Sequence, residues 1–319
     1  MNIKAKPVDI SKVKTLPLRD RTNKVSVKDF ATFSDSGEGI SSLLDTLPKI
    51  LKGEDFLDLV DKIITAYQKR KAVIVMMGGH VIKCGLSPLL ISLVKQGIIT
   101  AFVFNGASSI HDFEIALIGE TSEDVSLYLQ KGQFGMWEET GKLMNAAIQK
   151  AADTKIGMGE ALGNSLIELN APYNAFSLLA SCSELNIPIT VHVAIGTDII
   201  HQHPSANGAA IGEASFTDFR ILTNLVTQLE DGGVILNFGS AVILPEVFLK
   251  ALTIARNLGH TVSHFTAADF DMQQQYRPLE NVVRRPTEMG GKGYNFTGHH
   301  ELMIPLLAHA IKSRLQTID

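Results

Sequence analysis

The sequence predicts an α/β fold in which one parallel sheet carries helices on both faces. Short apolar runs, such as residues 72–77 and 233–238, are typical of strands that are buried on both sides. Each run ends in a turn of small residues, after which a helical pattern begins. A repeated unit of strand, turn and helix indicates a Rossmann-like parallel sheet, in which ligands collect beyond the carboxyl ends of the strands.

The predicted elements follow one another without an evident linker. Apolar residues recur at helical spacing between residues 43 and 67, and further helical patterns cover roughly residues 121–151, 160–185 and 299–316. Small residues predict a loop at 204–215, and the glycine-rich segment 290–293 is expected to be a mobile loop. The predicted strands are residues 72–77, 101–104, 187–194, 233–238 and 260–265.

The composition describes a deeply packed protein. Of the 319 residues, 19% are charged and 45% are apolar, whereas about 25% are charged in an average soluble protein. This surplus of apolar surface predicts a homo-oligomer, either a dimer or a tetramer. We expect residues 1–40, which are polar and turn-rich, to form an N-terminal arm, and residues 41–319 to form a single α/β domain.

Charge and targeting signals exclude several classes of protein. The net charge of −4 provides no basic field for a phosphate backbone, so nucleic acid is not an expected partner. No apolar run approaches the roughly 18 residues of a membrane span, and the N-terminus lacks the apolar region of a secretory signal. Two cysteines without paired spacing, Cys84 and Cys182, fit a reducing compartment. We therefore expect a cytoplasmic protein that has no membrane partner.

Small residues follow the predicted strands at the positions where a nucleotide would bind. Glycine and small hydroxyl residues let the backbone approach a phosphate, and a helix N-terminus favours its charge. Such turns after several strands point to an extended ligand, for example a dinucleotide. The run Gly157-x-Gly159-x-x-x-Gly163 is one residue too long for the dinucleotide fingerprint, so we interpret it as a turn that leads into a helix. The turns are Gly78-Gly79, Asn105-Gly106-Ala107-Ser108, Asp198, Gly239-Ser240 and Thr266-Ala267.

Two further groups of residues carry candidate chemistry. His111 and Asp112 follow a predicted strand and turn, and an imidazole beside a carboxylate can exchange protons near neutral pH. The same pair could instead be a helix-dipole aspartate beside an ordinary histidine. The segment 269–286 collects charge in a chain that has little, and it is either a ligand-binding segment or a solvated salt-bridge cluster. Lys292 beyond it could reach a ligand.

A metal centre is not expected. The chain contains His201-x-His203 and His299-His300, which could be combined with His192 and Asp112, but no third ligand has a diagnostic spacing. A metal-dependent hydrolase is nevertheless kept as an alternative class, because these residues could be brought together by the fold.

The order of these features resembles deoxyhypusine synthase and its NAD-binding superfamily over roughly residues 70–290. The segment Thr266-Ala267-Ala268-Asp269-Phe270-Asp271, followed by Arg277-Pro278-Leu279-Glu280-Asn281-Val282, resembles the family's Thr-Ala-x-x-Phe-Asp and Arg-Pro-x-Glu-x-Val. The resemblance implies a deoxyhypusine synthase-like fold, an NAD site and a Glu280 carboxylate that holds an amine. The implied NAD-binding residues are Gly79, Asn105, Gly106, Ala107, Ser108, Asp198, Gly239, Ser240, Thr266, Ala267 and Asp271.

The chain departs from the synthase where the catalytic lysine should stand. Four residues after Val282 the sequence has Pro286, preceded by Arg284 and Arg285. Because arginine keeps its proton, it cannot form the synthase's imine. Synthase chemistry would therefore require Lys292 to take the place of the missing lysine.

A second branch of the superfamily matches the segment around His111. Asn105-Gly106-Ala107-Ser108-Ser109-Ile110-His111-Asp112-Phe113-Glu114 resembles the Asn-Ala-x-x-His-Asp-x-Glu segment of NAD-dependent ornithine cyclodeaminase-type enzymes. This resemblance implies that NAD transiently oxidises an amine or amino acid. Arg277, Arg284 and Arg285 would suit its carboxylate, because guanidinium groups bind carboxylates in a bidentate manner.

The sequence thus predicts an NAD-binding enzyme, a transferase or a lyase, that acts on an amine or amino-acid substrate. The expected proton-transfer residues are His111 and Asp112. A non-catalytic nucleotide binder is the alternative from a different class.

Overall fold

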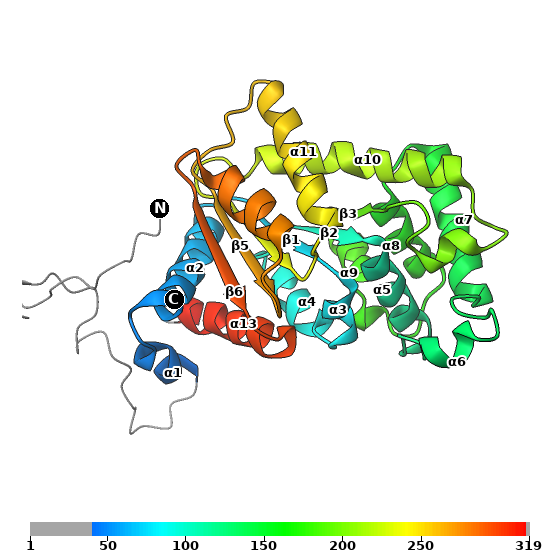
Figure 1. The fold of residues 1–319 in the computed structure, drawn as a ribbon, viewed down its shortest axis with the longest axis horizontal. Coiled ribbons are helices and arrows are strands. Elements are labelled where there is room, and N and C mark those ends of the chain that lie inside the picture. Colours follow the sequence, from blue (N-terminus) through cyan, green and yellow to red (C-terminus); the bar gives the residue numbers. More distant parts are fainter. Residues whose placement is uncertain (1–39, 317–319) are drawn as a thin grey trace, which may run out of the picture.

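The predicted α/β class is confirmed by the computed structural model, which describes residues 40–316. Six parallel strands form one sheet in the order β3-β2-β1-β4-β5-β6, with helices packed along it (Figure 1). The predicted N-terminal arm lies outside the described residues. The strands are β1 (Val73–Met77), β2 (Ala101–Asn105), β3 (Ile189–His192), β4 (Val234–Phe238), β5 (Thr266–Asp271) and β6 (Lys292–Thr297).

The strand order places a topological switch point between β1 and β4. The chain builds the sheet outward from β1 to β3 in one direction, and then from β4 to β6 in the other. This is the order of dinucleotide-binding folds, in which the ligand crevice opens at the carboxyl ends beside the switch point. Val73, Val234, Thr266 and Lys292 pair in register, so the amino ends of these four strands share one edge of the sheet.

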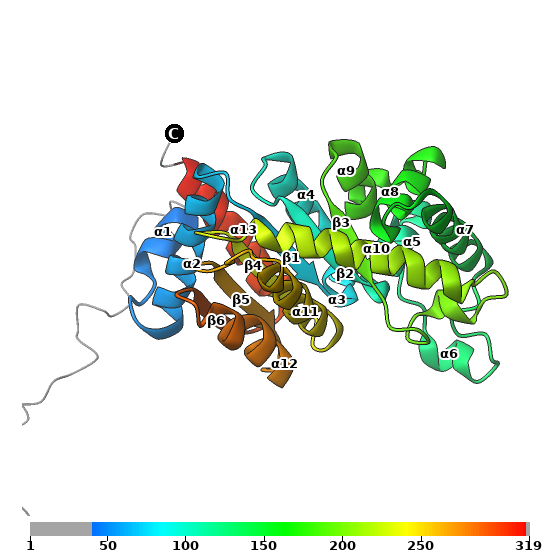
Figure 2. The same cartoon turned by 90° about the horizontal axis from the view of Figure 1, so that it is seen from above.

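Alternate side chains of the strands bury two separate cores. In β1, Val73, Val75 and Met77 pack into one core, whereas Ile74 and Met76 pack into the other, as the two-residue period of a strand requires. Figures 1 and 2 show the resulting helical layers. The first layer contains α2 (Leu51–Gln68), α4 (Ser87–Lys95), α5 (Gly106–Ile118), α9 (Leu178–Leu185) and α13 (His300–Gln316), and the second contains α11 (Ile243–Asn257) and the π-helix η5 (Leu279–Arg284). The long helix α10 (Gly208–Thr227) packs its first half into the first core and its second half into the other.

The remaining helices are short or lie at the β3 end of the molecule. Residues 121–151 do not form one helix as the pattern indicated, and the loop expected at 204–215 ends early, because the Asn207 side chain caps the first turn of α10. None of the helices between residues 40 and 316 has the length and apolar character of a membrane crossing. The helices outside the two layers are α1 (Ile40–Thr46), α3 (Gly79–Lys83), α6 (Val125–Leu129), α7 (Glu138–Thr154), α8 (Met158–Glu168), α12 (Tyr276–Pro278), η3 (Asn174–Phe176), η4 (Ile199–Gln202) and η6 (Arg285–Thr287).

The fifth strand was predicted six residues too early. The sequence favoured 260–265, but β5 is Thr266–Asp271 and all of its residues are buried. Its aspartates argued against a strand, yet the Asn237 side chain on β4 donates to Asp269 at 2.7 Å. Burial raises the pKa of Asp269 to about 7. As a correction, Thr266 and Ala267 begin β5 at the amino edge of the sheet, so they do not form a turn at its carboxyl end.

The predicted mobile loop at 290–293 is wrong in its second half, where β6 begins at Lys292. Tyr294 and Phe296 face inward, and the Phe296 ring stacks on Phe270 of β5 at 4.7 Å. Lys292 pairs with Asp58 of α2. Lys292 is therefore at the amino edge of the sheet, which rules out its predicted role as a substitute for the missing lysine beside a ligand at the carboxyl ends.

A buried aspartate closes the free edge of β3. Asp218 Oδ2, on α10, accepts the backbone N–H of Val191 at 2.7 Å and that of Gly159 at 2.9 Å. A Cβ on Gly159 would lie 2.1 Å from the carbonyl oxygen of Ile189. The run Gly157–Gly163 therefore allows α8 to pack against the edge strand, as expected for a turn that leads into a helix.

Replacement of Asp218 should destabilise this edge. Burial raises the Asp218 pKa to about 8, so the group keeps its proton at pH 7. We expect Asp218→Ala to lower the free energy of unfolding by about 2–4 kcal/mol, because two buried N–H groups lose their acceptor. Asp218→Asn keeps an acceptor and should cost about 1 kcal/mol or less. Urea unfolding measures both, and equal losses for the two variants would contradict the role of Asp218 as an acceptor.

Candidate active site

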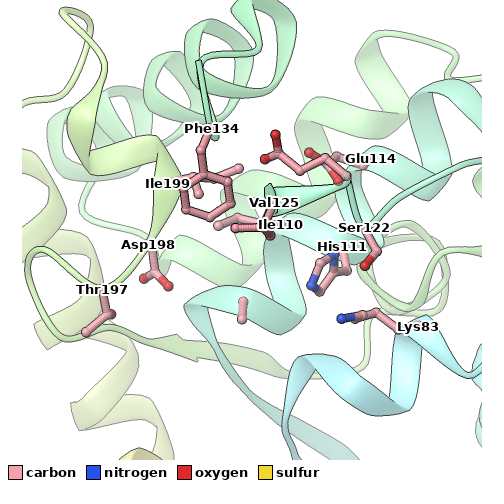
Figure 3. Close-up of a pocket in the computed structure, with 12 residues that line it drawn as sticks. Lys83, Ile110, His111, Glu114, Ser122, Val125, Phe134, Thr197, Asp198 and Ile199 are labelled. Atoms are coloured by element: carbon pink, nitrogen blue, oxygen red, sulfur yellow. The ribbon is translucent and has the colours of Figure 1, made fainter. Parts of the chain in front are cut away.

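A cavity of about 210 Å³ opens beyond the carboxyl ends of β2 and β3. Figure 3 shows Lys83 and His111 side by side at one side of it and Asp198 at the other. Ile110, Val125, Phe134 and Ile199 supply apolar walls. The remaining lining residues are Ala107, Glu114, Ser122, Glu123 and Thr197.

Hydrogen bonds determine the tautomer of His111, which lies in the second turn of α5. The Thr121 hydroxyl donates its one proton to Glu114 Oε2 at 2.5 Å. The same oxygen lies 2.7 Å from His111 Nδ1 and must accept there, so Nδ1 carries the imidazole proton. Nε2 is left with its lone pair and contacts no donor within residues 40–316. The hydrogen bonds among Glu114, Thr121 and His111 therefore leave Nε2 of His111 as a proton acceptor at the cavity.

Burial keeps the His111 imidazole neutral. It lowers the pKa of His111 to about 4, and the nearby Lys83 ammonium adds to this shift. Burial raises the pKa of Glu114, although the hydroxyls of Thr121 and Thr140 oppose the effect by donating to it. His111 is therefore an unprotonated proton acceptor at neutral pH.

Glu123 also lines the cavity, and one of its two carboxylate oxygens has no hydrogen-bond partner among the described residues. Its Oε1 accepts the backbone N–H of Gly135 at 2.9 Å. Its Oε2 is buried and has no donor among the described residues. A buried carboxylate oxygen without a donor is costly, so this position suits a ligand that carries N–H groups.

Two further side chains, those of Asp198 and His201, have polar atoms without hydrogen-bond partners near the N-terminus of α5. Asp198 Oδ2 and His201 Nε2 are buried and 3.9 Å apart, and neither has a hydrogen-bond partner in the described part of the chain. Gly196 N–H donates to His201 Nδ1, so Nε2 carries the proton. Burial raises the Asp198 pKa to about 6. One hydroxyl group between them would accept from His201 and donate to Asp198.

Glycines leave room for the backbone at the carboxyl edge. A Cβ on Gly106 would lie 1.8 Å from Asp198 Oδ2, and one on Gly79 would lie 2.9 Å from the His111 ring. Gly78 and Gly239 face each other across the switch point, where a Cβ on Gly78 would meet the Gly239 oxygen at 2.9 Å. These close approaches are contacts within the protein, so the glycines allow the chain to pack tightly at this edge. The unpaired Asp198–His201 atoms are the feature that suits a ligand with hydroxyl groups.

The other residues expected to bind NAD differ in whether they lie at the carboxyl edge and whether their side chains already have partners within the protein. Asn105, Ala107 and Asp271 lie at the carboxyl edge, where Asn105 caps α5 through the Ser108 N–H. Ser108 is fully buried against the Met77 carbonyl. Ser240 is also buried, and its hydroxyl accepts the Leu244 N–H at the start of α11. The Ser108 and Ser240 hydroxyls thus have structural partners.

The expectation that Asp112 shuttles protons is wrong, because its carboxylate points away from the cavity. Asp112 is fully buried. Its Oδ1 accepts Leu178 N–H at 2.8 Å, and its Oδ2 accepts Leu179 N–H at 2.9 Å and the Ser177 hydroxyl at 2.5 Å. All of these donors belong to the start of α9, so Asp112 is a helix cap contributed by a neighbouring helix.

The predicted substrate residues of segment 269–286 pair with their neighbours. Arg284 and Arg285 lie 2.8 and 3.7 Å from Glu280, and Arg277 lies 3.2 Å from Glu246 on α11. None of them lines the cavity around His111, and Figure 2 places α12 and α5 in different halves of the molecule. The salt-bridge interpretation of this segment is therefore the one the structure favours.

The histidines considered for a metal centre do not converge. His192 is buried beside Thr190, and burial lowers its pKa to about 3. His203 Nε2 lies 2.8 Å from the Gly135 carbonyl, whereas His201 faces Asp198. This set of residues gives no support to the metal-hydrolase alternative.

Sequence reasoning missed three residues of the site, namely Lys83, Thr121 and Glu123. Lys83 ends the short helix after the Gly78-Gly79 turn, which is a detectable signal. Thr121 and Glu123 occupy the irregular segment after α5, which was taken as part of a helix. Their roles depend on this segment folding back over α5, and no local pattern encodes that.

The parallel α/β fold of this chain is similar to that of solved deoxyhypusine synthase-like structures. The structure of an assigned deoxyhypusine synthase from Entamoeba histolytica aligns with a TM-score of 0.55 at 11% identity, over 89% of this chain and 96% of that one. A conserved LOR/SDH protein from Methanococcus maripaludis S2 aligns with a TM-score of 0.52 at 15% identity, over 84% and 71% of the two chains.

The same fold occurs within a longer enzyme. AgrE, in a ternary complex with ornithine and NAD+, aligns with a TM-score of 0.51 at 12% identity over 83% of this chain. The present chain spans about one third of AgrE, since 33% of AgrE is covered. Neither a protein-family model nor a curated protein sequence matches the chain.

Proposed function

We propose that the protein is an NAD-dependent enzyme that oxidises a small amine or amino acid at the carbon bearing nitrogen. The observation that carries this proposal is the cavity beside His111, which combines a neutral base, a cation and an unpaired carboxylate oxygen. The cavity adjoins the carboxyl edge of a sheet whose strand order is that of dinucleotide-binding folds. The complex of AgrE with ornithine and NAD+ has the same fold and supports the assignment.

The described residues fit NAD on two grounds. The unpaired Asp198 Oδ2 and His201 Nε2 suit a ribose hydroxyl, and the strand order of the sheet is that of dinucleotide-binding folds. Bound NAD supplies a hydride acceptor for the substrate carbon. The protein's contribution is to hold the substrate and to manage its proton.

Opposite charges in the cavity suit a zwitterion. The Glu123 Oε2 oxygen would accept from the substrate ammonium group, and the Lys83 ammonium would pair with its carboxylate. The volume of about 210 Å³ limits the occupant to a small molecule. Apolar side chains such as Ile110 and Ile199 line the cavity and lower the local polarity, which strengthens both interactions.

His111 would remove one proton from the bound ammonium group through Nε2. The freed nitrogen lone pair then forms the C=N bond while hydride leaves the adjacent carbon. Thr121 and Glu114 stabilise the resulting imidazolium through Nδ1–H. A substrate carboxylate beside Lys83 offsets the charge that lowers the His111 pKa, so the base becomes stronger once the substrate is bound.

Calorimetry with NAD+ and a screen of amines and amino acids test this proposal. We expect saturable NAD+ binding and NADH absorbance, or ammonia release, with a small amino acid. Glu123→Gln should raise KM about 10–100-fold, since a neutral amide holds an ammonium group less well. Glu139→Gln, on an exposed turn of α7, is the matched control.

The outcomes separate the competing functions. No NAD+ binding at millimolar concentration would overturn the proposal. Binding with no turnover on any substrate would instead favour the non-catalytic nucleotide binder. Assembly into a homo-oligomer also remains a prediction, which light scattering on the purified protein would test.

A further inference from the structure

A cluster of three metal-ligating side chains lies outside the cavity. His80 and Cys84 are four residues apart at the two ends of α3, so both project from the same face. Glu301, in the first turn of α13, meets them from a distant part of the chain. The candidate ligand atoms all lie within 4.8 Å of one another.

We propose that His80, Cys84 and Glu301 bind a zinc ion. Cys84 Sγ lies 3.3 Å from His80 Nε2 and 3.7 Å from Glu301 Oε2. Around zinc, with bonds of about 2.3 Å to sulfur and about 2.1 Å to nitrogen or oxygen, tetrahedral ligands lie about 3.5 Å apart. Both distances from Cys84 Sγ are close to this spacing, so the three side chains suit three corners of a zinc tetrahedron, and solvent would supply the fourth ligand.

Neighbouring histidines orient this set. His299 Nδ1 lies 3.8 Å from Glu301 Oε1, the oxygen that faces away from Cys84. The His300 ring contacts the His80 ring at 5.7 Å and is held by the Phe270 carbonyl at 3.0 Å. Both contacts with the proposed ligands are longer than hydrogen bonds, so these histidines limit the positions of Glu301 and His80 by charge and by ring packing.

Thiolate, imidazole and carboxylate together select zinc over magnesium or calcium, which prefer oxygen ligands. Binding replaces the Cys84 S–H bond with a Zn–S bond and releases one proton to solvent. The ion would join α3, after β1, to α13, after β6, although β4 and β5 separate these two strands in the sheet. Because Lys83 lies on α3, the ion would also steady one wall of the cavity.

Cobalt substitution of the chelator-treated full chain tests the site. We expect one equivalent of Co2+ to produce the visible bands of tetrahedral cobalt and a near-ultraviolet thiolate charge-transfer band, and one equivalent of Zn2+ to abolish both. Cys84→Ser should remove the charge-transfer band, and Glu301→Gln should weaken cobalt binding about 10–100-fold. Cys182→Ser, which alters the other cysteine, buried in α9, should keep the spectrum.

The proposal is overturned if the wild-type protein gives no thiolate band, or if Cys84→Ser retains it. Glu301 is on the surface, so Glu301→Gln decides the matter even if a cysteine variant folds poorly. We also expect Zn2+ to raise the Tm of the wild type but not that of Glu301→Gln; equal rises in both would count against the site.

Discussion

His111→Gln should reduce the rate of substrate oxidation by about 10²–10⁴-fold, the range typical of a lost general base. Glutamine fills the space but offers no basic nitrogen in place of Nε2. The Glu123 and Lys83 contacts remain, so KM should change little. Steady-state kinetics by NADH absorbance, with the substrate found in the screen, measure the effect.

His260→Gln provides the control for this variant. His260 is exposed at the end of α11, so its replacement should leave kcat unchanged. Thr121→Val removes the acceptor for Nδ1–H and should lower kcat about tenfold, because the tautomer is no longer held. If His111→Gln retains wild-type kcat, His111 is not the base.

The pH profile provides a second test of the same residue. The base must be unprotonated, and burial places its pKa at about 4 in the free protein. At saturating NAD+, which removes the contribution of Asp198 to the profile, kcat/KM for the amine should therefore fall only as pH falls toward 4, rather than near 6.5. In the substrate complex the Lys83 charge is offset, so the acidic limb of kcat should lie at higher pH. An acidic limb of kcat/KM near 6.5 would contradict the buried, neutral state of His111.

Strands whose residues are mostly apolar could be predicted from the sequence, but β5, which carries two aspartates, could not. The runs at β1, β2 and β4 are mostly apolar, with one asparagine each in β2 and β4, and their predicted bounds agree with the structure within one residue. In β5, Asp269 is tolerated because Asn237 on the neighbouring strand donates to it. That partner is adjacent only after the sheet has formed. The strand β6 was also missed, because it lies at the sheet edge and begins among glycines, which are typical of a loop.

The same distinction explains the outcome for the site. His111 follows the Asn105-Gly106 turn directly, so its place at the carboxyl edge could be inferred locally. The charges of Glu280, Arg284 and Arg285 were equally visible in the sequence, but they neutralise one another where η5 meets η6. Glu123 was invisible because its function depends on an unpaired oxygen, a property that only the folded chain defines.

Asp112→Ala should cause the largest loss of stability among the variants considered, about 3–5 kcal/mol in the free energy of unfolding. The carboxylate accepts three hydrogen bonds where no water reaches, and each unpaired buried donor costs about 1–3 kcal/mol. Asp124→Ala is the matched control, since Asp124 caps α6 through one exposed bond and should cost about 0.5–1 kcal/mol. Urea unfolding of both variants measures the difference, and equal losses would show that the buried cap contributes no more than a surface one.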